Sequence, residues 1–180
     1  MSIFKEWPKI PRGVLGTVVI TEKMDGTNAC IIIEDDKIIG VQSRKRLITP
    51  EDDNYGFAGW VSRNEEELLG LGEGYHYGEW AGLGIQGNPH CLPEKQFFLF
   101  NTARWGEHNP NTPKCCKVVQ KLFTGEYTSD IISDIMHDLA NTAKESKYKP
   151  EGIIVYFPKL GAMEKHTYNA PEGKWKELIK

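Results

Sequence analysis

The sequence lacks the features of a membrane-inserted or exported protein. Its 180 residues contain no apolar run of roughly 18 residues, the length that a membrane-spanning helix needs. Its start has no basic segment followed by an apolar one, as a secretory signal would have. The sequence therefore predicts no membrane association, and the cytoplasm is the expected location.

Cysteine is also scarce, and its spacing suits neither a disulfide framework nor a zinc site. The four cysteines are Cys30, Cys91, Cys115 and Cys116. They lack the spacing of zinc ligands, and adjacent cysteines do not easily bridge to each other. We expect reduced thiols. The alternative is a structural metal site made of His90, Cys91 and His108.

The chain is not strongly basic, which argues against binding nucleic acid by charge alone. Its formal net charge is −3, but the charge is uneven. Residues 1–50 carry eight Lys or Arg against six Asp or Glu, and residues 144–180 carry eight against five. Residues 51–143 carry six against fourteen. The two ends would suit a phosphate ligand if they meet in space; the alternative is that the charges are scattered over solvated faces.

What is present indicates one α+β domain. The length and a hydrophobic content of 39% are ordinary for a single globular domain. Alternating or β-branched runs predict strands, and apolar residues at helical spacing predict helices. The expected strands are 17–22, 29–34, 38–42, 75–80, 97–101 and 151–157, and the expected helices lie within 50–70 and at 114–123 and 128–146. We expect the first three strands to form one antiparallel meander.

The segment Glu22-Lys23-Met24-Asp25-Gly26-Thr27-Asn28 lies between the first two of these strands. Asp-Gly between apolar runs is typical of a β-hairpin, and a surface lysine beside it is ordinary. Lys-x-Asp-Gly also resembles the site of the lysine nucleophile in covalent nucleotidyltransferases. A lysine held where a strand ends can present its amine to a cleft.

Three further candidates follow along the chain. Arg44 belongs to a basic cluster after the third strand, which is either a solvated turn or a clamp on a ribose or phosphate. Glu79 lies at the end of strand 75–80. Phe98 and Phe100 share one face of the next strand, where such rings are packing residues or the wall of a base pocket.

The last candidates lie near the end of the chain. Glu151 places a carboxylate at the entrance of strand 151–157. Lys174-Trp175-Lys176 puts two amines on one face if the chain is extended there. These residues would add charge to a site formed around Lys23.

This series of motifs, taken in chain order, resembles the covalent nucleotidyltransferases, which include DNA ligases, RNA ligases and mRNA-capping enzymes. Gly26-Thr27-Asn28 and the segment Gly78-Glu79-Trp80-Ala81-Gly82-Leu83-Gly84-Ile85-Gln86 look most like the ATP-dependent, nick-sealing RNA ligases of tailed phages. The resemblance runs from about Glu22 to Lys176. It implies an adenylation domain with antiparallel sheets flanking a nucleotide cleft and helices outside, and it is compatible with a phage-encoded protein acting in the host cytoplasm.

The resemblance also implies a reaction. Lys23 would attack the α-phosphorus of ATP, release pyrophosphate and keep AMP, which passes to a 5′-phosphate before a 3′-hydroxyl seals the strand. A free lysine amine has a pKa near 10.4, so few amines are nucleophilic at neutral pH, and nearby positive charge favours the neutral form. Mg²⁺ or Mn²⁺ would help to neutralise the transition state.

The same resemblance assigns roles to the candidates. Glu22 would lie near the adenine edge, and Asn28 near the phosphate and metal. Arg44 and Glu79 would hold the ribose, and Phe100, rather than Phe98, would stack on the base. Lys174 and Lys176 would contact the α-phosphate, and Glu151 would hold the metal.

The sequence departs from this family in one respect. Only four residues follow Lys176, so residues 1–180 are expected to form one nucleotidyltransferase domain without an appended oligonucleotide-binding or C-terminal domain. We therefore expect a nicked RNA duplex as the substrate, with a protein partner for strand capture as an open possibility. The alternatives are a capping-type guanylyltransferase and a catalytically silent nucleotide- or RNA-binding module.

Overall fold

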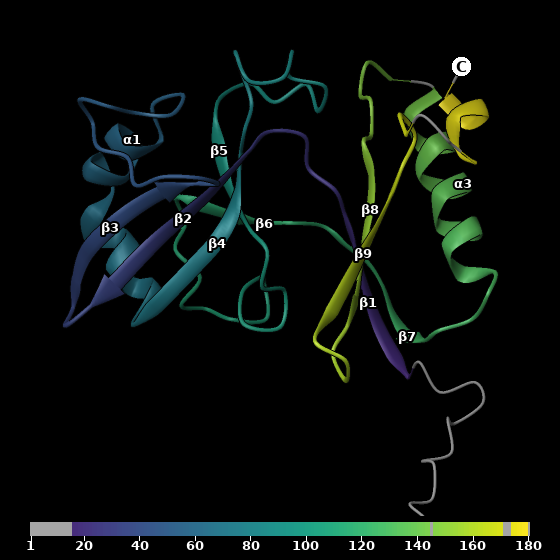
Figure 1. Ribbon diagram of the computed structural model, residues 1–180, viewed down its shortest axis with the longest axis horizontal. Coiled ribbons are helices and arrows are strands. Elements are labelled where there is room, and N and C mark those ends of the chain that lie inside the picture. Colours follow the sequence, from purple (N-terminus) through teal and green to yellow (C-terminus); the bar gives the residue numbers. More distant parts are fainter. Residues whose placement is uncertain (1–15, 145, 171–173, 180) are drawn as a thin grey trace, which may run out of the picture.

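The computed structural model describes residues 16–144, 146–170 and 174–179, which form two β-sheets side by side (Figure 1). The four-stranded sheet has the order β7-β1-β8-β9, with all neighbours antiparallel. Its strands are β1 (Thr17–Glu22), β7 (Lys121–Glu126), β8 (Gly152–Phe157) and β9 (Ala162–Thr167).

The second sheet has five strands in the order β3-β2-β4-β5-β6. Its pairs are antiparallel except for the parallel pair β5 and β6. Its strands are β2 (Thr27–Glu34), β3 (Lys37–Ser43), β4 (Gly74–Ala81), β5 (Gln96–Leu99) and β6 (Cys116–Val118). The predicted α+β class and its largely antiparallel sheets are thus confirmed.

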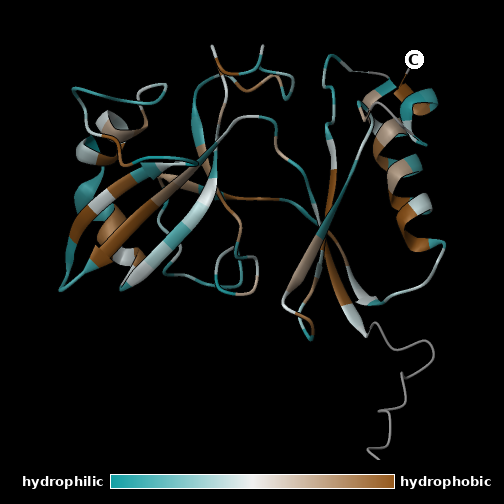
Figure 2. Cartoon of the chain, in the orientation of Figure 1, coloured by the Kyte–Doolittle hydropathy of each residue, from teal (hydrophilic) through white to brown (hydrophobic). Residues whose placement is uncertain are grey.

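Each sheet is covered on one face by helices. Short helices pack on the five-stranded sheet: α1 (Phe57–Arg63), α2 (Glu65–Leu68) and the 3-10 turn η1 (Leu69–Leu71). The four-stranded sheet is covered by α3 (Ile131–Lys144) and by the 3-10 turn η2 (Lys176–Ile179). Figure 2 shows hydrophobic residues on α3 and on the strands behind it. No described helix has both the length and the hydrophobicity needed to cross a membrane.

In the described part of the chain, the two largest hydrophobic cores lie between each sheet and its helices. Behind the five-stranded sheet, the rings of Phe57, Trp60, Trp80 and Phe97 pack at centroid distances of 4.9–6.0 Å. Behind the four-stranded sheet, α3 buries Met136 against residues of β1 and β8. Side chains alternate between the two faces along a strand, so every second side chain of each sheet points away from these helices.

Two predictions about the sheets are wrong. The first three strands do not form one meander, because β1 pairs with β7 and β8 whereas β2 pairs with β3 and β4. The hairpin interpretation of Asp25-Gly26 fails for the same reason. The chain crosses from one sheet to the other in this segment, since the hydrophobic pattern defines the buried face of a strand but not its partner.

The predicted helix at 114–123 is also wrong. This stretch ends one sheet and starts the other: Cys116 pairs with Phe97 in parallel, and Lys121 pairs with Thr21. Its short apolar run is compatible with a helix and with a buried strand, so pairing with neighbouring strands determines which of the two forms. The helix predicted at 128–146 is confirmed as α3.

Candidate active site

Lys23 lies where β1 ends and the chain leaves for the other sheet. Its backbone N–H donates to the carbonyl of Gly152 at the start of β8, with an N···O distance of 2.9 Å. This bond brings Lys23 beside Glu151, and the Lys23 ammonium forms an ion pair with the Glu151 carboxylate. Both side chains are about one-fifth exposed, at 23% and 20%, so each is partly accessible from solvent.

Gly26 lets the crossing segment pass directly against β4. A Cβ on Gly26 would lie 2.4 Å from the Trp80 carbonyl oxygen, so only glycine fits this close approach. The Gly26 N–H donates to Glu79 Oε1 at 3.2 Å, and Asn28 Nδ2 donates to Glu79 Oε2 at 2.8 Å. Glu79 is therefore held by two donors from the segment that follows Lys23.

Glu79 is the most strongly perturbed carboxylate at this site. Burial raises the pKa of Glu79 to about 7, although the positive charge of Lys23 and the hydrogen bond from Asn28 act in the other direction. Glu151 also interacts electrostatically with Glu79. The structure thus brings together Lys23, Asn28, Glu79 and Glu151, four of the predicted site residues.

Glu151 is the group that suits a divalent cation. Its Oε2 is buried and accepts no hydrogen bond in the described part of the chain, so its contact is the ion pair with Lys23. No cluster of three or more His, Cys, Asp or Glu within the described ranges could hold a metal by itself. A single carboxylate suits Mg²⁺ or Mn²⁺ only if other ligands come from water or a bound anion.

The alternative metal site at His90, Cys91 and His108 is not formed. His90 Nε2 accepts the Asp25 N–H at 2.9 Å, and a ring nitrogen of His108 lies 3.2 Å from the Ala103 carbonyl oxygen. All four cysteines are free thiols, as predicted.

Glu22 points to the other side of β1, toward α3. Its carboxylate accepts the Tyr148 hydroxyl and lies 3.3 Å from His90 Nδ1. Burial, together with this bond to Glu22, raises the pKa of Tyr148, so the phenol stays protonated. Because His90 also accepts the Asp25 N–H, a buried chain of polar groups fixes the segment on both sides of Lys23.

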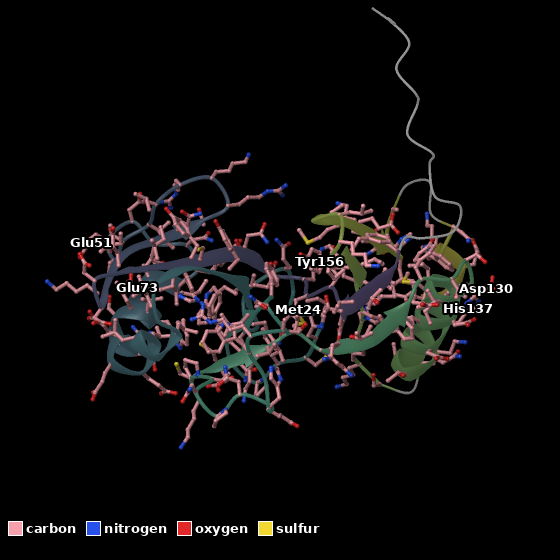
Figure 3. All side chains as sticks on the ribbon, turned by 90° about the horizontal axis from the view of Figure 1, so that it is seen from below. Met24, Glu51, Glu73, Asp130, His137 and Tyr156 are labelled. Carbon is pink, nitrogen blue, oxygen red and sulfur yellow. The ribbon has the colours of Figure 1, made fainter. Side chains whose placement is uncertain are left out.

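A cavity of about 430 Å³ lies on this same side. Its lining includes Glu22, Met24, Phe98, Leu139 and Tyr148. Figure 3 shows Met24 between the two sheets and His137 on α3 at the far side of the four-stranded sheet. Phe98 therefore contributes to this cavity, whereas Phe100 is 42% exposed.

Arg44 and Phe100 lie near the site without a direct contact to Lys23. Arg44 is exposed just after β3, at the same end of the sheet as Asn28, because Ser43 pairs with Ala29. Phe100 follows β5, and its N–H donates to the Tyr77 carbonyl at 3.0 Å. Their predicted roles toward a ribose and a base stay predictions.

Lys174 and Lys176 are not brought to Lys23. The Lys174 ammonium lies 4.6 Å from the centroid of the Trp175 ring. That ring is buried in the core behind the four-stranded sheet, edge-on to His137 and His166. The phosphate contact predicted for these two lysines therefore stays a prediction.

Lys165 was not among the predicted site residues. In the sheet register Lys165 pairs with Ile154, which pairs with Thr21. By alternation these residues share the face opposite α3, while the neighbouring His166 contacts Trp175 on the α3 side. Alternation within a predicted strand 162–167 would have been the signal for this residue.

Comparisons with known proteins identify a family and a fold for this chain. A family model described as RNA ligase matches residues 16–166. No curated protein matches the chain.

Solved structures of Naegleria gruberi RNA ligase share the fold. A variant with ATP and Mn gives a TM-score of 0.61 at 23% identity, covering 86% of this chain and 50% of that one. A variant with AMP and Mn gives 0.60 at 22% identity, with the same 86% and 50% coverage. A structure with PPi gives 0.58 at 24% identity, covering 84% and 49%. The chain spans about half the length of the structures it matches.

Proposed function

Because the chain belongs to the RNA ligase family, whose model matches residues 16–166, we propose that it is an ATP-dependent RNA ligase that reacts through Lys23. The observation that carries the proposal is the meeting of Lys23, Glu151, Glu79 and Asn28 where the chain crosses between the sheets. A nucleophile, a metal-binding carboxylate and polar groups for a nucleotide are the parts that this chemistry needs.

In the proposed first step, the Lys23 amine attacks the α-phosphorus of ATP. The Lys23 ammonium first loses one proton to solvent and becomes nucleophilic; a P–N bond then forms, the P–O bond to pyrophosphate breaks, and the nitrogen loses a second proton to solvent. A divalent cation bound by Glu151 and phosphate oxygens would neutralise charge on the phosphates and compete with Lys23 for the carboxylate. Lys23 then leaves its ion pair with Glu151 and turns toward the phosphorus.

The other residues hold the nucleotide in this proposal. Glu79 is already oriented by Asn28 and Gly26, so it can accept ribose hydroxyls, with Arg44 at the same end of the sheet. Phe100 offers an exposed ring to the base. The Glu22 carboxylate already contacts Tyr148 and His90, so in this proposal its main role is to position the segment that carries Lys23.

Two sets of residues are candidates for the positive charge that would contact the α-phosphate. The family resemblance indicates Lys174 and Lys176, whereas the sheet register supports Lys165. The proposed substrate is a nicked RNA duplex, because a small protein surface gains from ends that are already aligned. A protein partner for strand capture and a cytoplasmic location complete the proposal, with residues 1–180 acting as one nucleotidyltransferase domain.

The test is the intact mass of the protein after separate incubations with ATP and with GTP, each with Mg²⁺ or Mn²⁺. We expect one added AMP in the wild-type protein and none in Lys23→Ala. Lys165→Ala is the matched control, because it removes an amine from the same face and should slow the reaction without abolishing it. An adduct that persists in Lys23→Ala would overturn the assignment, and GMP in place of AMP would favour the guanylyltransferase alternative.

A further inference from the structure

The five-stranded sheet carries exposed aromatic side chains on the face that has no helical cover. Tyr75 and Tyr77 of β4 are 60% and 54% exposed. Their rings stack with a centroid distance of 6.1 Å and an interplanar angle of 16°. Two large rings held parallel in solvent gain little for the fold, since neither is buried in a core.

These tyrosines are continuous with the candidate active site. Tyr75, Tyr77 and Glu79 alternate along β4, so they point to one face, with Glu79 at the end held by Asn28 and Gly26. The register confirms this order across the sheet: Tyr75 pairs with Ile32, Tyr77 with Cys30 and Glu79 with Asn28. Each tyrosine is about 7 Å from the next position on that face.

The charges along this face run in one direction. At the active-site end, Arg44 is exposed, and exposed Lys117 pairs with Phe98 in the row of Glu79. At the other end, the β2–β3 turn and Glu73 form a group of net negative charge: Glu73 accepts the N–H groups of Asp35 and Asp36, and exposed Glu34 and Lys37 pair beside them. Figure 3 shows Glu73 in the half of the molecule away from α3. A phosphate backbone is therefore attracted near the active site and repelled beyond Tyr75.

We infer that Tyr75 and Tyr77 stack two unpaired nucleobases of the RNA strand whose end enters the Lys23 site. This inference rests on the proposed function and refines its substrate: pairing holds the strands of a nicked duplex together, and the two nucleotides beside the reacting end are unpaired. Aromatic rings on a sheet are a general way to bind unstacked bases, because every base offers a π-face. The acidic turn limits the platform to about two nucleotides, one for each ring.

A protein partner is the other occupant that such rings could fit. The RNA strand is favoured because the platform leads directly to the groups that would receive its end, and because its positive end is the active-site end. Bases paired in a flush duplex cannot lie on the tyrosine rings, so the platform distinguishes a nick with an unpaired end from a flush nick.

The test is the equilibrium binding of fluorescently labelled RNA, measured by anisotropy with the full chain. The probes are a single-stranded RNA, a flush-nicked RNA duplex, and the same duplex with two unpaired nucleotides at the nick. We expect Tyr75→Ala and Tyr77→Ala each to weaken binding of the first and third probes by roughly five- to a hundred-fold, and the double variant to weaken it by roughly thirty-fold or more, since stacking is worth ~1–3 kcal/mol per base. Binding of the flush duplex should change less than about twofold, because it offers no unpaired base.

Tyr55→Ala is the matched control. Tyr55 is 48% exposed, and its backbone carbonyl accepts bonds that the substitution leaves in place. AMP addition without RNA should be unchanged in all of these variants, which separates this inference from the proposed reaction. Unchanged RNA binding in the double variant, an equal loss with the flush duplex, or a loss confined to AMP addition would each overturn the inference.

Discussion

The four-stranded sheet carries the Lys23–Glu151 ion pair of the candidate site, whereas the five-stranded sheet carries Glu79 and Asn28, which hydrogen-bond to each other. Lys23 and Glu151 come from the ends of adjacent strands and form an ion pair. Glu79 and Asn28 come from paired positions on β4 and β2 and bind each other. The Gly26 N–H joins the two groups, because it donates to Glu79 only three residues after Lys23.

The contributions of the two sheets to the candidate site can therefore be tested separately. Changes on the four-stranded sheet should affect the chemical step, because Lys23 and Glu151 are the groups nearest the transferred phosphate in the proposed reaction. Changes on the five-stranded sheet should affect nucleotide positioning and its dependence on pH. Changes behind the four-stranded sheet, where Glu22 is buried, should affect stability first.

After Lys23, the largest effect should come from Glu151. Glu151→Gln removes the charge that binds both Lys23 and a cation, so we expect AMP addition to slow by about a hundred-fold or more, measured by single-turnover mass spectrometry. Glu164→Gln is the control, because Glu164 lies on β9 and contacts His166 instead. Equal rates in the two variants would remove Glu151 from the chemical step.

A smaller effect, with a distinct dependence on pH, is expected for Glu79. Since the pKa of Glu79 is about 7, the carboxylate becomes protonated as the pH falls through this value and no longer accepts from both Gly26 and Asn28. AMP addition should therefore rise with pH near 7, and Glu79→Gln should be roughly tenfold slower and lose this step. Exposed Glu94→Gln is the control and should keep the wild-type profile.

The same group should affect stability in the opposite direction. The pKa of Glu79 is higher in the folded protein than its ordinary value of 4.5, so the folded state binds the proton more tightly. Its contribution to stability is then full below pH 4.5 and is lost as the pH rises through about 7. Denaturant unfolding between these pH values should show this slope in the wild-type protein and not in Glu79→Gln.

The smallest effect on activity should come from Tyr148. Tyr148→Phe removes one donor to the buried Glu22 carboxylate, so we expect the free energy of unfolding to fall by ~1–3 kcal/mol. The rate of AMP addition should change less than about twofold, because Glu22 still faces His90 and the change lies behind Lys23. Tyr127→Phe removes a hydroxyl beside the same core and is the control. A larger loss of rate than of stability would place Glu22 in the reaction itself.

Local patterns predicted much of the fold. Alternation and β-branched runs indicated β1, β2, β3, β4 and β8, and helical spacing indicated α3. The same patterns did not show that β1 and β2 belong to different sheets, because alternation along a strand contains no information on its partner. The stretch 114–123 failed for a related reason, since Cys116 takes its conformation from parallel pairing with Phe97.

The candidate site was predicted only in part. The Lys-x-Asp-Gly, Gly-Glu and Glu-Gly motifs lie at strand ends, and the structure places Lys23, Glu79 and Glu151 near one another, whereas their roles stay predictions. Tyr148 and His90 carry no such signal, because their contact with Glu22 joins segments far apart in the chain. Lys165 was passed over in favour of Lys174 and Lys176, because the strand that orients it was not predicted.

The order of strands along the chain has a consequence for folding kinetics. Every strand of the five-stranded sheet lies between residues 27 and 118, whereas the other sheet joins β1 to strands beyond residue 120. Closing such long loops is slow, so we expect the five-stranded sheet to form early and β1 to pair with β8 late. During synthesis Lys23 would leave the ribosome well before Glu151, and the two residues would form their ion pair only when the distant parts of the chain have come together.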